Sequence, residues 1–220
     1  MKIQPDFETF VKRCEQGNLI PVWCEILADT ETPISTFRKL VDGQYGFLLE
    51  SVEQGENLGR YSFIGCNPEI VIRGRGNRIE ISKYGDEEPV SQSPENPMAF
   101  LREFMQRYRP VKDPALEEIP YLGGAVGYMA YDLVRCFEKL PDDNPDDLKL
   151  PEVYFMITDT LAIFDHVRHR TILLTNAHVT NGPETAYQAA IHKIELMAER
   201  LRNPWLRRGP DPLDATSPEM

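Results

Sequence analysis

The sequence predicts an α+β fold, namely a largely antiparallel β-sheet sandwich with a few packed helices. Three observations lead to this class. Many short segments are apolar runs or alternate apolar and polar residues, as strands do. A few helical segments are grouped between these strands. The chain has 220 residues, of which 41% are hydrophobic, and this is enough to build a proper core.

A helix and a strand are predicted at the amino terminus. Apolar side chains recur at helical spacing over residues 7–14, and Asp6 is placed to cap this helix. We expect the helix to stop near Gly17, because glycine adopts the left-handed conformation that ends many helices. Residues 19–27 follow as a strand that Pro21 interrupts.

The next part of the chain is rich in strands. A short helix is expected at residues 36–41, and strands are expected at 47–51 and 60–65. Residues 69–73 and 78–82 alternate apolar and polar side chains on either side of a turn that contains glycine. This pattern predicts a β-hairpin.

The middle of the chain alternates loops with regular elements. Residues 86–96 are polar and contain proline, which predicts an exposed loop. One proline opens and another closes a helix over residues 97–110. Residues 123–131 are a glycine-rich strand, whose missing side chains let another backbone approach closely. An acidic, solvated loop is expected at residues 142–147.

Two strands and a helix are predicted for the remainder. The strands cover residues 153–164 and 171–179 around a polar turn. A helix starts at Pro183 and places one apolar stripe on its surface. The stripe consists of Tyr187, Ile191, Ile194, Met197 and Leu201. We expect residues 1–203 to form the domain and residues 204–220, which lack periodicity, to form a linker.

Composition excludes several classes of protein. The net charge of −11 argues against a nucleic-acid partner, because such proteins need clustered basic residues to displace counterions from phosphates. No apolar run approaches the roughly 18 residues that span a bilayer, so no membrane association is expected. We expect no signal peptide, because no apolar core follows the first residues, and the four cysteines form no CxxC pair. We therefore expect reduced thiols and a cytoplasmic protein without structural zinc.

One strand ends in a pair of residues that can bind a free amino acid. Glu50 offers an acceptor to an ammonium group, and Ser51 offers a hydroxyl to a carboxylate. The guanidinium of Arg60, at the start of the next strand, could pair a ligand carboxylate with two hydrogen bonds. The alternative is structural: the pair would cap a buried strand on its solvent side, and Arg60 would form a surface salt bridge worth about 0–1 kcal/mol.

Two further motifs are assigned to structure rather than chemistry. The glycine run at 123–127 lacks both the Lys-Ser/Thr end of a phosphate-binding loop and the spacing of a dinucleotide fold, which favours a packing role. His166 and His169 have a spacing that metal ligands can use, but a metal site would need further ligands converging on them. A polar turn is the favoured interpretation of this pair.

Four motifs carry a resemblance to a known family, anthranilate synthase component I. They are LLES with GRYSFIG (48–65), GGAVGY with AYD and FE (123–138), LP.VYFM (150–156), and FDH with LLTNA (164–177). The resemblance runs from about Phe7 to Leu201 and points to that family's amino-terminal domain. It implies that Glu50, Ser51 and Arg60 belong to the site where L-tryptophan exerts feedback inhibition. It also implies that the glycine-rich strand packs this domain onto its catalytic partner.

For the complete protein, the resemblance implies conversion of chorismate and ammonia to anthranilate and pyruvate in tryptophan biosynthesis. The activity uses Mg²⁺, and a glutamine amidotransferase subunit supplies the ammonia. The family's chorismate-binding domain, which carries the catalytic and Mg²⁺-ligating residues, has no motif in this sequence. We therefore expect no catalytic and no metal-binding residue here, and an inactive chain when it is isolated.

Three alternatives stay open. The first is component I of aminodeoxychorismate synthase, a folate-pathway relative with the same amino-terminal fold; the intact LLES motif favours anthranilate synthase. The second is a stand-alone regulatory module that binds an amino acid. The third is a structural half that docks a separately encoded catalytic chain.

Overall fold

The computed structural model describes most of the chain. The described residues are 1–27, 31–41, 43, 45–50, 59–83, 89–94, 96–141 and 145–203. Four predictions fall wholly or partly outside them: the placement of Ser51, the linker at 204–220, residues 142–144 of the acidic loop, and residues 86–88 and 95 of the loop predicted over 86–96.

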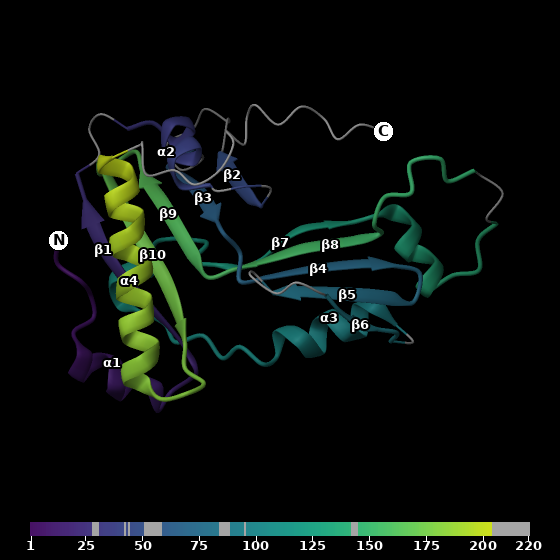
Figure 1. Cartoon of the computed structure of the whole chain (residues 1–220), viewed down its shortest axis with the longest axis horizontal. Helices are drawn as coiled ribbons and strands as arrows, with labels where there is room; N and C mark the ends of the chain where they lie inside the picture. Colours follow the sequence, from purple (N-terminus) through teal and green to yellow (C-terminus); the bar gives the residue numbers. More distant parts are fainter. Residues whose placement is uncertain are drawn as a thin grey trace. The chain divides into compact units, whose positions relative to one another are not determined.

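The described residues form two compact units, each built around its own sheet (Figure 1). The first unit comprises residues up to Pro68, Tyr108–Gly123, and the residues from Thr158 onward; the second comprises Glu69–Arg107 and Gly124–Ile157. Each sheet has five strands, and helices accompany both. The α+β class with antiparallel strands is confirmed. The single domain over residues 1–203 stays a prediction.

The first unit pairs its five strands in the order β1-β10-β9-β3-β2, all antiparallel. These are β1 Leu19–Ile26, β2 Gly46–Glu50, β3 Tyr61–Cys66, β9 Thr160–Asp165 and β10 Arg170–His178. Three helices pack on the sheet: α1 Phe7–Cys14, α2 Pro33–Leu40 and α4 Pro183–Arg202. Figure 1 shows α4 lying along β10. Phe10, Leu173 and Ile194 are completely buried in the core between these layers.

Local signals account for the helices of this unit. The carboxylate of Asp6 caps α1 by accepting the Thr9 N–H at 2.8 Å, as predicted. The start of α2 lies three residues earlier than predicted, because Thr32 and Ser35 form a reciprocal capping box. The predicted stripe of α4 is confirmed, since most of its residues are buried.

Gly17 has a different role from the one predicted. The helix α1 ends earlier, at Cys14, and Gly17 has no left-handed conformation. A Cβ atom at Gly17 would lie 2.3 Å from the carbonyl oxygen of Arg109. Glycine is therefore needed here because another backbone segment passes close by.

Pro21 does not interrupt its strand, so that part of the prediction is wrong. The ladder between β1 and β10 runs unbroken from Leu19 to Ile26, with Pro21 opposite Asn176. The strand β1 lies at the edge of the sheet, where a residue without an N–H group can be tolerated.

The second unit pairs its strands in the order β6-β5-β4-β8-β7. These are β4 Ile70–Arg75, β5 Arg78–Lys83, β6 Val90–Gln92, β7 Gly124–Met129 and β8 Val153–Thr158. The predicted hairpin is confirmed as β4 and β5, with Gly76 in the turn at a φ of 55°. The short β6 lies in the predicted loop; its three side chains are exposed, so burial left no pattern in the sequence.

The described residues of the second unit also include two helical segments. The helix α3 Pro97–Met105 begins as predicted, with Asn96 as its cap, but it ends well before Pro110. A 3₁₀ helix, η2 Tyr131–Cys136, follows β7 and was not predicted. The close approach predicted for the glycine-rich strand is confirmed at Gly127, where a Cβ atom would lie 1.8 Å from the carbonyl oxygen of Tyr154.

The single strand predicted over residues 153–164 is two strands in different sheets. The break is at Asp159, between β8 and β9. The carbonyl oxygen of Asp159 accepts the Asn176 N–H at 2.7 Å, and its carboxylate accepts hydrogen bonds from Thr160 and Lys193. Polar residues thus hold the backbone where the chain leaves one sheet and enters the next.

Candidate ligand-binding site at the ends of β2, β3 and β9

The structure describes two of the three predicted ligand-binding residues. Glu50 is the last residue of β2, which is an edge strand, and its side chain is exposed. Arg60 directly precedes β3, the partner strand of β2. Ser51 lies outside the described residues. Both described residues therefore belong to the same end of the first sheet, but they make different contacts.

Glu50 contacts a short chain of polar side chains that crosses three strands. Ser62 stands opposite Glu50 in the ladder between β2 and β3, and its hydroxyl donates to the Glu50 carboxylate at 3.4 Å. The Nε2 atom of His166 lies 2.7 Å from the same hydroxyl oxygen. Ser62 is 2% exposed, so water has little access to replace either contact. In the tautomer that carries its proton on Nε2, His166 is the donor in the second bond, and the one hydroxyl proton of Ser62 goes to Glu50.

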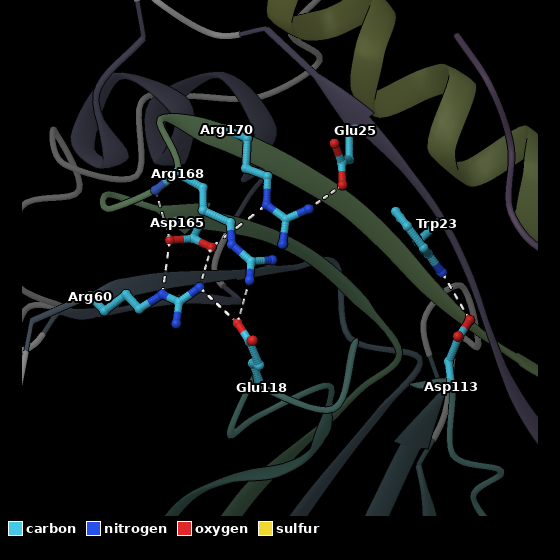
Figure 2. Close-up of polar contacts among 8 residues, drawn as sticks. All are labelled: Trp23, Glu25, Arg60, Asp113, Glu118, Asp165, Arg168 and Arg170. Atoms are coloured by element: carbon cyan, nitrogen blue, oxygen red, sulfur yellow. Dashed lines mark hydrogen bonds and ion pairs between the residues drawn. The ribbon is translucent and has the colours of Figure 1, made fainter. Parts of the chain in front are cut away.

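Arg60 binds carboxylates of its own chain (Figure 2). Its Nε and one Nη donate to the two oxygens of Asp165, both at 3.0 Å, and that Nη also donates to Glu118 at 3.0 Å. The Asp165 side chain is completely buried, whereas Glu118 is exposed. The structural alternative for Arg60, a salt bridge within the protein, is therefore present, and it is stronger than a surface pair because one partner is buried and held bidentately.

Two more arginines join this cluster. Arg168 donates from its backbone N–H to Asp165 at 3.2 Å and from its guanidinium to Glu118 at 2.7 Å. The guanidinium of Arg170 lies 3.6 Å from Asp165 and donates to Glu25. Positive and negative charges balance within this charge cluster. Its members are Glu25, Arg60, Glu118, Asp165, Arg168 and Arg170.

The cluster shifts the pKa values of its carboxyl groups. Burial raises the pKa of Asp165, but hydrogen bonds from Arg60 and from the Arg168 N–H outweigh burial and hold this pKa below its ordinary value. The hydrogen bond from Arg60 lowers the pKa of Glu118 as well. Both groups are therefore ionised at neutral pH, and Asp165 accepts hydrogen bonds without acting as a proton donor.

A polar cavity of about 270 Å³ lies beside these residues. Its wall includes His166, which links it to Glu50 through Ser62, and Asp165, which links it to Arg60. The cavity is lined by Glu31, Phe164, Asp165, His166, His169, Arg170 and Thr171. Carboxylate acceptors and nitrogen donors together suit a ligand that carries both an ammonium and a carboxylate group.

Metal binding finds no support among the described residues. In that part of the chain, no group of three or more His, Cys, Asp or Glu side chains is arranged to hold a metal ion. His166 instead contacts Ser62, and its ring stacks on Phe164 with centroids 6.1 Å apart. Likewise, none of the helices described is both long and apolar enough to cross a membrane.

Sequence reasoning missed most residues of this site, and Ser62, Asp165 and Glu118 illustrate why. Ser62 lies within the GRYSFIG motif and Asp165 within FDH. Both motifs carried the resemblance, but the contacts of these two side chains were not predicted. Glu118 comes from the segment between η1 Pro114–Leu116 and β7, and nothing in its sequence context marks it. The contacts join residues about 50 to 105 positions apart, and only the tertiary fold brings them together.

Comparisons with known proteins agree with the motifs. Anthranilate synthase component 1 of Acetivibrio thermocellus is 40% identical over 179 residues, which are 81% of this chain and 35% of that protein. The Pseudomonas putida protein of the same name is 37% identical over 219 residues, or 96% of this chain and 42% of that protein. The chain thus spans well under half the length of these relatives.

A solved structure supports the fold. The crystal structure of anthranilate synthase component I from Streptococcus pneumoniae matches with a TM-score of 0.52 and 23% identity, over 81% of this chain and 36% of that one. The sequence profile of the family described as chorismate binding enzyme matches residues 47–218, which include Glu50, Arg60, Ser62 and His166. That match covers residues assigned above to an amino-terminal domain, and the absence of a chorismate-binding part stays a prediction. The chain belongs to the chorismate binding enzyme family.

Proposed function

We propose that this chain is the amino-terminal part of a cytoplasmic anthranilate synthase component I and carries part of its L-tryptophan feedback site. The observation that supports this most is the exposed Glu50 carboxylate at the end of β2, within the motif that suggested the function. The relatives reported above carry the name anthranilate synthase component 1. This favours anthranilate synthase over the aminodeoxychorismate alternative.

The complete protein would act as a carbon–oxygen lyase that forms anthranilate and pyruvate from chorismate. A glutamine amidotransferase subunit would supply ammonia. The described residues do not fit the Mg²⁺ that this activity requires, because no cluster of ligating side chains occurs among them. As the resemblance implies, we assign no catalytic or metal-binding role to residues of this chain, and we expect the isolated chain to be inactive.

Feedback control requires that tryptophan bind one conformation of the enzyme better than another. In this proposal, the ammonium group of tryptophan binds Glu50 and its carboxylate binds Ser51 and donors nearby. Arg60 takes part mainly by shaping the site, because Asp165 and Glu118 already occupy its guanidinium. A coupling free energy of about 1–3 kcal/mol between the tryptophan site and the active site of the complete enzyme would give effective inhibition.

The test uses the full-length protein with its amidotransferase subunit. Chorismate, glutamine and Mg²⁺ are supplied, and anthranilate is followed by its fluorescence while L-tryptophan is titrated. Formation of anthranilate that tryptophan suppresses supports the proposal. Formation of aminodeoxychorismate would assign the protein to the folate-pathway relative, and tryptophan-insensitive anthranilate formation would remove the regulatory part.

A further inference from the structure

The end of β2 carries a carboxylate whose position is set from the neighbouring strands. Glu50 is the last residue of an edge strand and is exposed, so its side chain has no core packing to hold it. Its carboxylate accepts a hydrogen bond from the hydroxyl of Ser62. Among the described residues, Ser62 is therefore the group that orients this carboxylate.

Ser62 is in turn held by His166. The hydroxyl oxygen and Nε2 are 2.7 Å apart, which is a short hydrogen bond, whereas the bond to Glu50 is longer at 3.4 Å. Ser62 is buried, so its hydroxyl cannot turn to water without leaving a polar group unsatisfied. In the tautomer protonated at Nε2, the shorter bond from His166 directs the Ser62 proton toward Glu50.

His166 is itself fixed on two sides. Its backbone N–H donates to the carbonyl oxygen of Arg60 at 2.9 Å, and its ring stacks on Phe164 at an interplanar angle of 21°. Phe164 pairs with Ser62 across β3 and β9, so the ring and the hydroxyl are held by one ladder. A ligand-binding group is held accurately when the side chains that contact it are rigid, and His166 is such a rigid side chain.

The geometry points to Ser62 and His166 as positioning residues, which hold the Glu50 carboxylate for the ammonium group of an amino-acid ligand. This inference rests on the proposed function and adds two residues to it. An ionised carboxylate has about four acceptor sites, so the bond from Ser62 leaves capacity for an ammonium group. Neither positioning residue needs to contact the ligand.

The test compares two ligands in the full-length synthase with its amidotransferase subunit. One is L-tryptophan, and the other is indole-3-propionate, which keeps the ring and the carboxylate but lacks the ammonium group. The variants are Ser62→Ala and His166→Leu, which remove a hydroxyl and a donor. Inhibition of anthranilate formation by tryptophan, and competition of indole-3-propionate with tryptophan, give the affinity for each ligand.

We expect each variant to raise the tryptophan concentration for half inhibition by about tenfold, as for loss of one hydrogen bond to a charged group. Binding of indole-3-propionate should change by less than about twofold, because it has no ammonium group. His166→Gln keeps an amide N–H donor near the position of Nε2 and should restore most of the tryptophan affinity. Matched controls are Ser93→Ala and His192→Leu, at exposed positions that make none of the contacts described for this site.

Two outcomes overturn the inference directly. Equal losses for both ligands would mean that the variants damage the site in general. Unchanged inhibition by tryptophan would mean that Ser62 and His166 do not position Glu50. If the wild-type enzyme is not inhibited by tryptophan, the proposed function fails. Thermal-shift titration with the other amino acids then tests the inference by itself. The inference fails as well if no amino acid raises the Tm of the wild type more than it raises the Tm of Glu50→Gln.

Discussion

The guanidinium of Arg60 holds the buried carboxylate of Asp165 by two hydrogen bonds, each 3.0 Å long. These bonds join the start of β3 to the end of β9. The pair lies directly beside the Ser62–His166 contact, since His166 follows Asp165 and Ser62 lies two residues after Arg60. The charge cluster therefore braces the same strand ends that position Glu50.

Replacing Arg60 by lysine tests this brace. Lysine keeps the positive charge but cannot form two parallel hydrogen bonds, so the buried carboxylate of Asp165 loses one of its hydrogen-bond donors. We expect Arg60→Lys to lower Tm by roughly 5 °C, measured by circular dichroism. The control is Arg78→Lys, which alters an exposed pair with Glu80 and should shift Tm by no more than about 1 °C. Equal shifts for the two variants would contradict the bracing role.

Asp113 gives the first unit an acid-sensitive contact. Burial raises the pKa of Asp113, but hydrogen bonds from Arg13 and Trp23 outweigh burial and hold this pKa below the ordinary 3.8. The unfolded chain therefore binds this proton more readily, so the stabilisation is complete above about pH 4 and is lost as the pH falls through the lower folded pKa.

We expect the free energy of unfolding of the wild type to fall more steeply below about pH 4 than that of Asp113→Asn. Urea titrations at a series of pH values, followed by tryptophan fluorescence, provide the measurement. Trp23 is 8% exposed and donates to Asp113 at 3.0 Å, so its emission reports on this contact. Parallel pH curves for the two proteins would show that Asp113 is not the sensitive group.

Gly127 should tolerate no side chain. A Cβ atom there would lie 1.8 Å from the Tyr154 carbonyl oxygen, so β7 would have to move away from β8. Gly127→Ala is expected to cost about 2 kcal/mol of unfolding free energy, as overpacking does. Ala125→Ser, an exposed change on the same strand, serves as the control in the same denaturation experiment. A harmless Gly127→Ala would argue against this pairing of β7.

Thiol reactivity distinguishes the buried cysteines from the exposed one. All four are free thiols; Cys136 is exposed, while Cys24 and Cys66 are buried. Burial raises the pKa of Cys24 to about 11, so little thiolate forms at pH 8. We expect iodoacetamide to label Cys136 rapidly and Cys24 only after unfolding, as read by peptide mass spectrometry. Rapid labelling of Cys24 in the native protein would contradict the burial of β1.

The regulatory proposal predicts the effect of a larger side chain at Ser51. In the full-length enzyme, Ser51→Phe should fill the inhibitor pocket and raise the tryptophan concentration for half inhibition by at least about tenfold, with anthranilate formation retained. Initial rates across a tryptophan titration give the result. Equal sensitivity of the variant and the wild type would exclude Ser51 from the feedback site.

Elements with a strong local pattern could be predicted from the sequence. The hairpin β4–β5 combines alternation with a glycine turn, and α4 carries a long apolar stripe. The break at Asp159 could not be predicted, because both sides of it have strand character and the change of sheet depends on distant partners. The start of α2 was recognisable only from Thr32 and Ser35, whose capping box precedes the apolar positions.

Only those residues of the site could be predicted whose side-chain type by itself suggests ligand binding. Glu50 and Arg60 drew attention because a carboxylate and a guanidinium at strand ends can bind an amino acid. The role of Ser62 follows from its contact with His166, and these residues are 104 positions apart in the chain. Such a contact depends on the register between β3 and β9, which a single sequence does not display.

The strand order of the first sheet has a consequence for the protein during its synthesis. The edge strand β1 pairs with β10, so its ladder partner leaves the ribosome more than a hundred residues later. At a synthesis rate of about 5–20 residues per second, β1 has no strand β10 to pair with for on the order of 10 s or more. The centre of the sheet, β9 and β10, is thus made last, and the nascent chain is expected to need protection from chaperones until α4 has emerged.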